Sequence, residues 1–153
     1  MPERHSPDQA IAVRDAPLAD LHPRTLYRIL ALRVDVFVVE QGCVYRELDG
    51  RDLELSARLV WAERSDDILG TLRLLGEPDG ARRIGRVATV ASARGQGLAA
   101  RLVQRALQLS ATSDIVLDAQ AHLAAWYARF GFVRSAPDFV EDGIAHTPMR
   151  RQG

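Results

Sequence analysis

Apolar residues recur at two different spacings along this chain, and the two spacings predict different elements. Residues 25–39 and 98–109 carry them at steps of three and four, the pattern of a helix that buries one face. Shorter stretches carry them at alternate positions or in brief runs, which is typical of strands. The predicted strands are residues 10–14, 59–63, 68–75, 83–90 and 115–119.

Glycines mark the ends of several of these elements. Gly42 ends the first helix, and Gly131 ends a short third helix that the pattern places at residues 122–130. Residues 132–133 and 139–149 are expected to add the last two strands. Strands and helices in this order predict an α/β (α+β) fold built on one mixed sheet.

Length and charge limit the functions to consider. A chain of 153 residues with 47% hydrophobic content fits one domain over residues 1–153, with residues 1–9 as a flexible tail. The 20 basic and 20 acidic residues cancel, so we expect no nucleic-acid partner. A single cysteine, Cys43, excludes an internal disulfide. The chain shows no apolar run long enough to span a bilayer, so we expect a cytoplasmic protein with no membrane partner.

One segment carries specific chemistry, because a predicted strand runs through a glycine turn directly into a helix. The main-chain N–H groups at such a helix entrance converge and attract an anion. Gly95 and Gly97 let the backbone approach a diphosphate, and the small Ala99 keeps the first helical turn close to it. The spacing matches neither a P-loop nor a complete dinucleotide-binding fingerprint. A plain strand-to-helix connection is the alternative interpretation.

The sequence Arg94-x-x-Gly97-x-Ala99 resembles the signature of GNAT acetyltransferases, and residues 125–132 resemble the tyrosine-bearing helix of that superfamily, which ends in Gly-Phe. Three further blocks resemble its ElaA-like branch. They are residues 32–41, 119–123 and 141–146. Two positions depart from the branch: residues 56–58 lack its histidine, and Ala145 replaces a proline. Acceptor specificity is therefore expected to differ if that histidine contacts substrate.

The resemblance implies a mostly antiparallel sheet of six to seven strands flanked by about four helices, and acetyl-coenzyme A (acetyl-CoA) as cosubstrate. Its pantetheine arm would hydrogen-bond the main chain at Val87 and Thr89, unless those positions belong to an ordinary strand ladder. The diphosphate would lie on the glycine turn. The residues expected to bind it are Arg94, Gly95, Gln96, Gly97, Leu98 and Ala99.

The resemblance also suggests how an amine would be acetylated by direct attack. A main-chain N–H near Val87 would stabilise the oxyanion, and Tyr127 would protonate the leaving thiolate. The alternative for Tyr127 is a structural aromatic residue. Glu40, at the end of the first helix, is the first candidate for the base that takes the proton from the amine, with His122 as a rival. His146 is a second rival base.

The expected acceptor is a primary amine of a small molecule or peptide, bound by Arg33, Glu40 and His146. The alternative for Arg33 is a solvated charged surface. We expect no metal, because neither His122 nor His146 has the ligand spacing of a metal site. The protein is expected to be a monomer or a homodimer.

Two other functions remain open at this point. The block around Arg33 and residues 73–75 resembles acyl-homoserine-lactone synthases, although those enzymes do not usually carry the Arg-x-x-Gly-x-Ala turn. A coenzyme A sensor that has the fold without turnover is the other alternative. Tyr127 favours an enzyme over a sensor.

Overall fold

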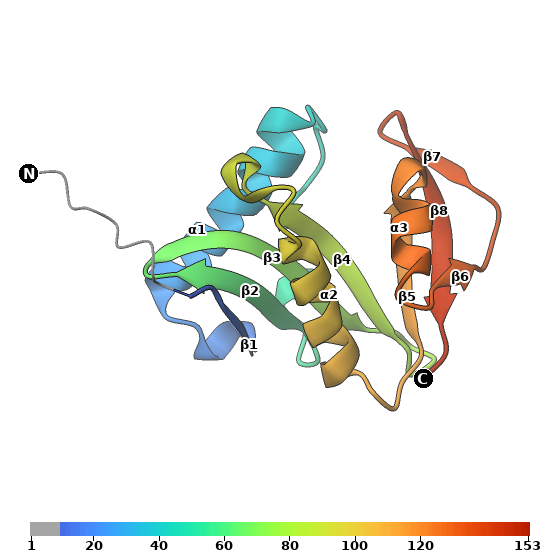
Figure 1. Cartoon of the computed structure of the whole chain (residues 1–153), viewed down its shortest axis with the longest axis horizontal. Helices are drawn as coiled ribbons and strands as arrows, with labels where there is room; N and C mark the ends of the chain where they lie inside the picture. Colours follow the sequence, from blue (N-terminus) through green and yellow to red (C-terminus); the bar gives the residue numbers. More distant parts are fainter. Residues whose placement is uncertain (1–9) are drawn as a thin grey trace, which may run out of the picture.

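The predicted strands form one sheet in the computed structural model, which describes residues 10–153 (Figure 1). The predicted tail, residues 1–9, lies outside the described residues. The strands are β1 (Ala12–Ala16), β2 (Arg58–Arg64), β3 (Asp67–Gly76), β4 (Arg82–Thr89), β5 (Ile115–Gln120), β6 (Val133–Arg134), β7 (Phe139–Glu141) and β8 (Ile144–Arg151). The α-helices are α1 (Pro23–Val34), α2 (Leu98–Leu109) and α3 (Ala124–Ala128).

The strand order is β1-β2-β3-β4-β5-β8-β6, and β7 pairs with the first three residues of β8. Only β4 and β5 run parallel, so the prediction of a mixed, mostly antiparallel sheet is confirmed. The described residues contain eight strands rather than six or seven, and three α-helices rather than about four. The extra strand arises because Asp142 and Gly143, both at positive φ, fold the predicted strand 139–149 into a hairpin.

Alternation along β2 assigns its side chains to two cores. Val60 and Ala62 point to the face covered by α2, where Leu102 is fully buried. Leu59 and Trp61 point to the other face, where α1 packs. Trp61 is therefore a core residue. Both faces of the sheet around β2 and β3 are covered by a helix, which makes this half of the sheet a rigid support.

The first helix changes its hydrogen-bond pattern near its end. The periodicity predicts one helix over 25–39, whereas the α-helix ends at Val34 and a π-helix follows over Asp35–Glu40. The N–H of Gln41 donates to the carbonyl of Val36, five residues back, at 3.0 Å. Apolar spacing does not reveal such a widened turn, because the same side chains stay buried. Short π-helical segments are frequent at functional sites.

Strands β4 and β5 separate soon after they meet. Their parallel pairing consists of Arg82 with Ile115 and Arg83 with Val116, and Figure 1 shows the two strands diverging beyond these pairs. The facing edges of β4 and β5 therefore have no strand partner along most of their length. Main-chain groups on a free edge are ready to pair with a ligand of extended shape.

A buried ion network fixes the long loop between α1 and β2. Arg33 is 1% exposed and donates to Glu47 at 2.7 Å and to Asp52 at 2.6 Å. Arg73 on β3 donates to Asp49 at 2.8 Å and to Asp52 at 3.4 Å. Asp52 thus joins a helix arginine to a strand arginine. Because the loop has little regular structure, these bonds determine where it lies.

We expect Asp52→Ala to lower the free energy of unfolding by about 3 to 5 kcal/mol, because Arg33 and Arg73 would lose a buried counter-charge. Urea denaturation followed by circular dichroism measures the change. Asp66→Ala, in an exposed turn, is the control and should change stability little. Equal effects of the two substitutions would show that the network does not hold the loop.

Candidate active site

The entrance of α2 presents free main-chain donors. Gly95 and Gly97 lie at φ 78° and 74°, a conformation that favours glycine, and a Cβ added at either would meet no atom within 4 Å. Within the described part of the chain, the N–H groups of residues 95–100 have no hydrogen-bond acceptor. The positive end of the helix dipole lies at the same place. This row of open donors can hold an anion.

The Arg94 side chain connects the glycine turn to two other segments. Its Nη1 and Nη2 donate to Glu40 at 2.9 and 2.6 Å, and its Nε donates to the carbonyl of Thr89 at 3.1 Å. The hydrogen bond from Arg94 lowers the pKa of Glu40. Glu40 therefore lies at the glycine turn rather than in an acceptor pocket, and its lowered pKa makes it a weaker base.

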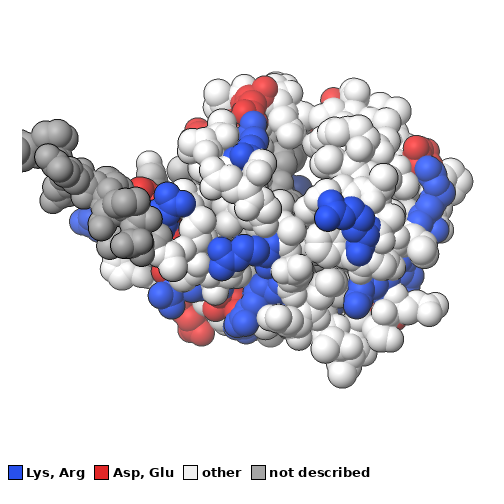
Figure 2. Space-filling view, in the orientation of Figure 1, with Lys and Arg blue, Asp and Glu red and all other residues white. Residues whose placement is uncertain are grey.

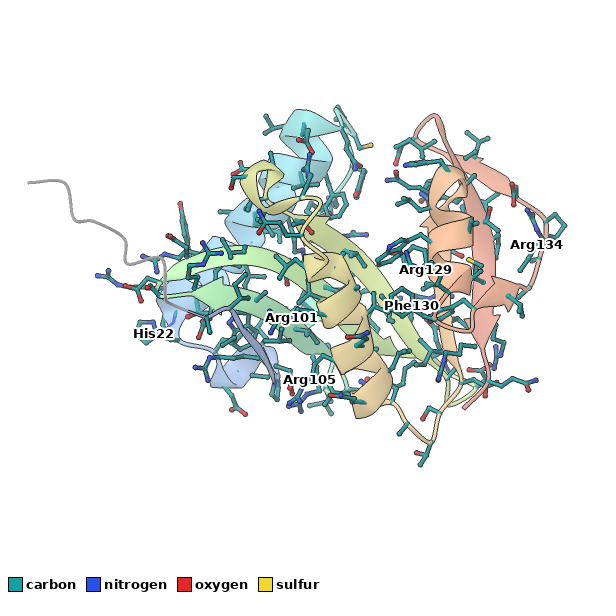
Figure 3. The ribbon with its side chains drawn as sticks, viewed as in Figure 1. His22, Arg101, Arg105, Arg129, Phe130 and Arg134 are labelled. Carbon is teal, nitrogen blue, oxygen red and sulfur yellow. The ribbon has the colours of Figure 1, made fainter. Side chains whose placement is uncertain are left out.

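Two arginines flank the region where β4 and β5 separate. Arg101 on α2 and Arg129, which follows α3, lie on the same face of the molecule (Figure 3), and Figure 2 shows basic side chains on both sides of this face. Both are exposed, and neither forms an ion pair with any described residue. Arg101 donates only to the carbonyl of Ile11, at 3.1 Å. Their charges are available to a ligand.

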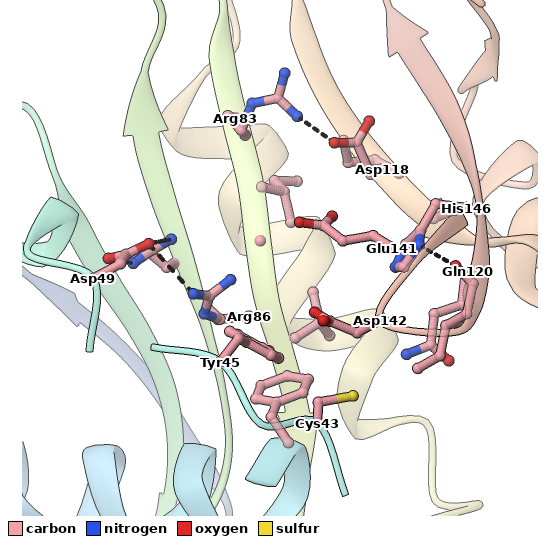
Figure 4. A pocket seen from close by; sticks show the side chains of 18 of the residues that line it. Cys43, Tyr45, Asp49, Arg83, Arg86, Asp118, Gln120, Glu141, Asp142 and His146 are labelled. Atoms are coloured by element: carbon pink, nitrogen blue, oxygen red, sulfur yellow. Dashed lines mark hydrogen bonds and ion pairs between the residues drawn. The ribbon is translucent and has the colours of Figure 1, made fainter. Parts of the chain in front are cut away.

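A cavity of about 620 Å³ lies beside β4 and β5 (Figure 4). The end of the first helix and the loop after it form one wall, with Phe37 and Tyr45. The β7–β8 hairpin forms the opposite wall, with Glu141 and His146. Tyr127 also lines the cavity. The space is large enough for a small ligand and combines aromatic with charged side chains.

Tyr127 lies in an aromatic cluster on α3. Its ring contacts Trp126 and Phe132 edge to face, at centroid distances of 4.9 and 6.2 Å. The residue is 7% exposed, and no hydrogen-bond partner for its hydroxyl exists among residues 10–153. Burial raises the pKa of Tyr127 to about 12. The hydroxyl is therefore protonated at neutral pH and available as a proton donor at the cavity.

A β-bulge bends β4 where it passes the cavity. Leu72 on β3 faces both Arg86 and Val87, and Arg86 takes φ 52°. Arg86 lies 2.8 Å from Glu47 and stacks over the Tyr45 ring at 5.3 Å. These contacts hold a backbone conformation that is rare for a residue with a side chain. The bulge redirects the main chain of Val87 at the cavity wall.

Asp49 stabilises the same wall. Burial disfavours its charged form, but hydrogen bonds from Arg73 and from the main chain of Arg51 outweigh that effect and lower the pKa of Asp49 to about 2. Asp49 also lies 3.3 Å from Arg86. The carboxylate is therefore ionised at neutral pH and committed to these arginines.

The structure brings together only part of the predicted site. Val87, Tyr127 and His146 line the cavity, and the Nδ1 of His146 lies 2.9 Å from the carbonyl of Ile144. His122 is exposed and is not among the lining residues. Arg33 lies inside the wall, bound to carboxylates, rather than on the cavity surface.

Several residues of the site have no signal in periodicity or motif spacing. Tyr45 and Arg86 reach the cavity through long-range pairing, and Arg101 and Arg129 look like ordinary helix-surface charges in the sequence. Asp142 belongs to a block that resembles the ElaA-like branch, and its place before Gly143 is a turn signal. The sequence prediction nevertheless ran one strand over residues 139–149, and nothing in the sequence placed the Asp142 side chain in a cavity.

Comparison with known proteins identifies the family. A family model described as an acetyltransferase (GNAT) domain matches residues 32–152. This chain belongs to the GNAT acetyltransferase family. A UPF0039 protein of Mycobacterium tuberculosis is 49% identical to this GNAT protein over 146 residues, which are 93% of this chain and 94% of that one. Protein ElaA of Escherichia coli is 34% identical over 145 residues, 91% of this chain and 95% of that one.

Solved structures agree. An acyl-CoA N-acyltransferase from Pseudomonas aeruginosa matches with a TM-score of 0.89 and 42% identity, over 93% of this chain and 99% of that chain. The crystal structure of Escherichia coli ElaA matches with a TM-score of 0.85 and 32% identity, over 94% of this chain and 100% of that chain. The predicted GNAT family and ElaA-like branch are confirmed, and the family supports acyl transfer from an acyl-coenzyme A to nitrogen.

The described residues contain neither a membrane-spanning helix nor a metal-binding cluster. None of the helices over residues 10–153 is both long and apolar enough to cross a lipid bilayer. In the same part of the chain, no three His, Cys, Asp or Glu side chains gather in a way that would hold a metal ion.

Proposed function

We propose that this GNAT protein transfers an acetyl group from acetyl-CoA to a primary amine of a small molecule or peptide by direct attack. One observation carries the proposal: the gap between β4 and β5 lies between the open donors at the entrance of α2 and the cavity that Tyr127 lines. A cytoplasmic location follows from the proposal, since acetyl-CoA is available there.

The charged end of the cofactor fits the α2 side. The N–H groups of residues 95–100 are available for a diphosphate, and the bare Cα atoms of Gly95 and Gly97 leave room for it. The unpaired charges of Arg101 and Arg129 favour the same anion. Arg94 supports the turn rather than the ligand, because its guanidinium binds Glu40 and its main-chain N–H donates to the carbonyl of Ala91 at 3.3 Å.

The pantetheine arm fits the free edge of β4. Its two amide groups have the hydrogen-bonding pattern of a strand, so they can pair with the main chain at Val87 and Thr89. This arrangement leads the thioester toward the bulge. A main-chain N–H aimed at the thioester oxygen there would stabilise the oxyanion by about 3 kcal/mol.

The proposed reaction proceeds by addition and elimination at the thioester carbon. The nitrogen lone pair of a neutral amine forms the new C–N bond, and electrons move to the carbonyl oxygen. The carbon–sulfur bond then breaks, and the Tyr127 hydroxyl gives its proton to the thiolate. His146 is the best-placed candidate for the base that accepts the proton of the amine, because it lines the cavity whereas Glu40 and His122 do not.

We expect Gly97→Val to abolish binding of coenzyme A, because the new side chain would fill the space where the diphosphate lies. Isothermal titration calorimetry measures the affinity. Gly80→Val is a matched control, since Gly80 also has a positive φ and open surroundings but lies in the turn between β3 and β4. Normal affinity in Gly97→Val would contradict the proposed placement of the diphosphate.

We expect Tyr127→Phe to lower kcat by about 10²-fold, the effect of removing a positioned general acid, without weakening the binding of coenzyme A. Release of the free thiol from acetyl-CoA measures turnover. Tyr27→Phe, which alters an exposed tyrosine, is the control. An unchanged kcat for Tyr127→Phe would remove this residue from the mechanism. The chain contains no lysine, so acetylation of its own lysine side chains cannot add to the measured rate.

A further inference from the structure

Most arginines of the cavity are neutralised by carboxylates. Four of the five arginines that line it form ion pairs, and only Arg46 has no partner among the described residues. The pairs are Arg51 with Glu54 at 2.8 Å, Arg73 with Asp49 at 2.8 Å, Arg83 with Asp118 at 3.2 Å and Arg86 with Glu47 at 2.8 Å. Little positive charge is therefore left for an acceptor on the wall formed by the loop.

The opposite wall has free negative charge. Glu141 and Asp142 project from the β7–β8 hairpin into the cavity (Figure 4). Within residues 10–153, neither carboxylate has an ion pair or a hydrogen bond to its side chain. Pairing of Glu141 with Ile144 and of Val140 with Ala145 holds the hairpin in register. Two uncompensated carboxylates therefore face the cavity from a defined position.

The same cavity contains a second group without a partner. Tyr127 lines it and is 7% exposed as a residue, and its hydroxyl has no hydrogen bond within the described chain. A hydroxyl that lines a cavity without a protein partner is available to hydrogen-bond a ligand that enters it. The acidic hairpin and the proposed proton donor thus share one cavity, with Phe37 and Leu123 supplying apolar surface.

We propose that the acceptor is a small diamine or polyamine, in which one nitrogen attacks the thioester while Glu141 and Asp142 bind an ammonium group at the other end. This inference rests on the proposed function and specifies its substrate class. An aliphatic chain between the two nitrogens matches the apolar surface, and the second ammonium matches the unpaired carboxylates. An amino acid would instead bring a carboxylate toward two carboxylates, which is repulsive.

Three acceptors with four carbon atoms each test the proposal. They are 1,4-diaminobutane, butylamine and 4-aminobutanoate, which share a reacting amine and end in a cation, an apolar group and an anion. We expect kcat/KM to be about tenfold higher for 1,4-diaminobutane than for the other two, the effect of one additional charge-assisted contact. Thiol release at constant ionic strength measures each rate. The preference should decrease as salt is added, because the contact is partly exposed.

Two isosteric variants test whether the preference for the diamine comes from the carboxylates of the hairpin. We expect Glu141→Gln and Asp142→Asn each to raise KM for 1,4-diaminobutane about three- to tenfold with little change in kcat, so that its advantage over butylamine declines. Asn tolerates the positive φ of residue 142. Asp114→Asn, a carboxylate paired with Arg150 at the far end of the sheet, is the control and should keep the full preference.

The outcomes separate the two proposals. Turnover with a preference for butylamine or 4-aminobutanoate, or an unchanged preference in both variants, would overturn the diamine inference and leave acetyl transfer intact. No thiol release with any of the three amines, although coenzyme A binds, would overturn the diamine inference. No thiol release across a broad panel of amines and peptides would overturn the proposed function as well.

Discussion

The separation of β4 from β5 is the constraint on which the rest of the site depends. Two residue pairs join the strands, and beyond them each strand has main-chain groups on its facing edge that no neighbouring strand satisfies. The gap stays open because β4 is held in place on the other side. Ile84 of β4 packs in the core under α2, and Arg86 of β4 pairs with Glu47 and Asp49 of the loop. The open edge is therefore maintained by the packing of the fold, and its unpaired main-chain groups can bind a ligand that carries amide groups.

Charge is distributed differently at the two ends of this opening. On the α2 side, free main-chain donors and the unpaired Arg101 and Arg129 favour an anion. On the cavity side, four of the five lining arginines are paired with carboxylates and Arg46 alone is unpaired among the described residues, while the carboxylates of Glu141 and Asp142 are free on the opposite wall. An anionic cofactor and a cationic acceptor can therefore enter from opposite ends and meet near Tyr127, with opposite electrostatic preferences keeping each out of the other's place.

Features set by local sequence were predictable. The glycine turn, the helix after it and the tyrosine helix follow from short-range spacing, and the resemblance built on them gave the family and the sheet. Features made by pairing distant segments were not. The Arg86 bulge depends on register with β3. Glu40 was expected in the acceptor pocket from its place at the end of the first helix, and no spacing in the sequence indicates that Arg94, 54 residues later, binds it. Asp142 shows the same limit: a strand was predicted through this residue, and neither the hairpin nor the cavity that Asp142 faces was predicted.

A crystal structure of the protein bound to coenzyme A would show whether the gap between β4 and β5 holds the cofactor. The proposed binding mode places the diphosphate on the main-chain donors of residues 95–100, the arm beside the free edge of β4, and the sulfur toward the Tyr127 hydroxyl. Coenzyme A bound at another surface, with the gap between β4 and β5 still unfilled, would contradict it.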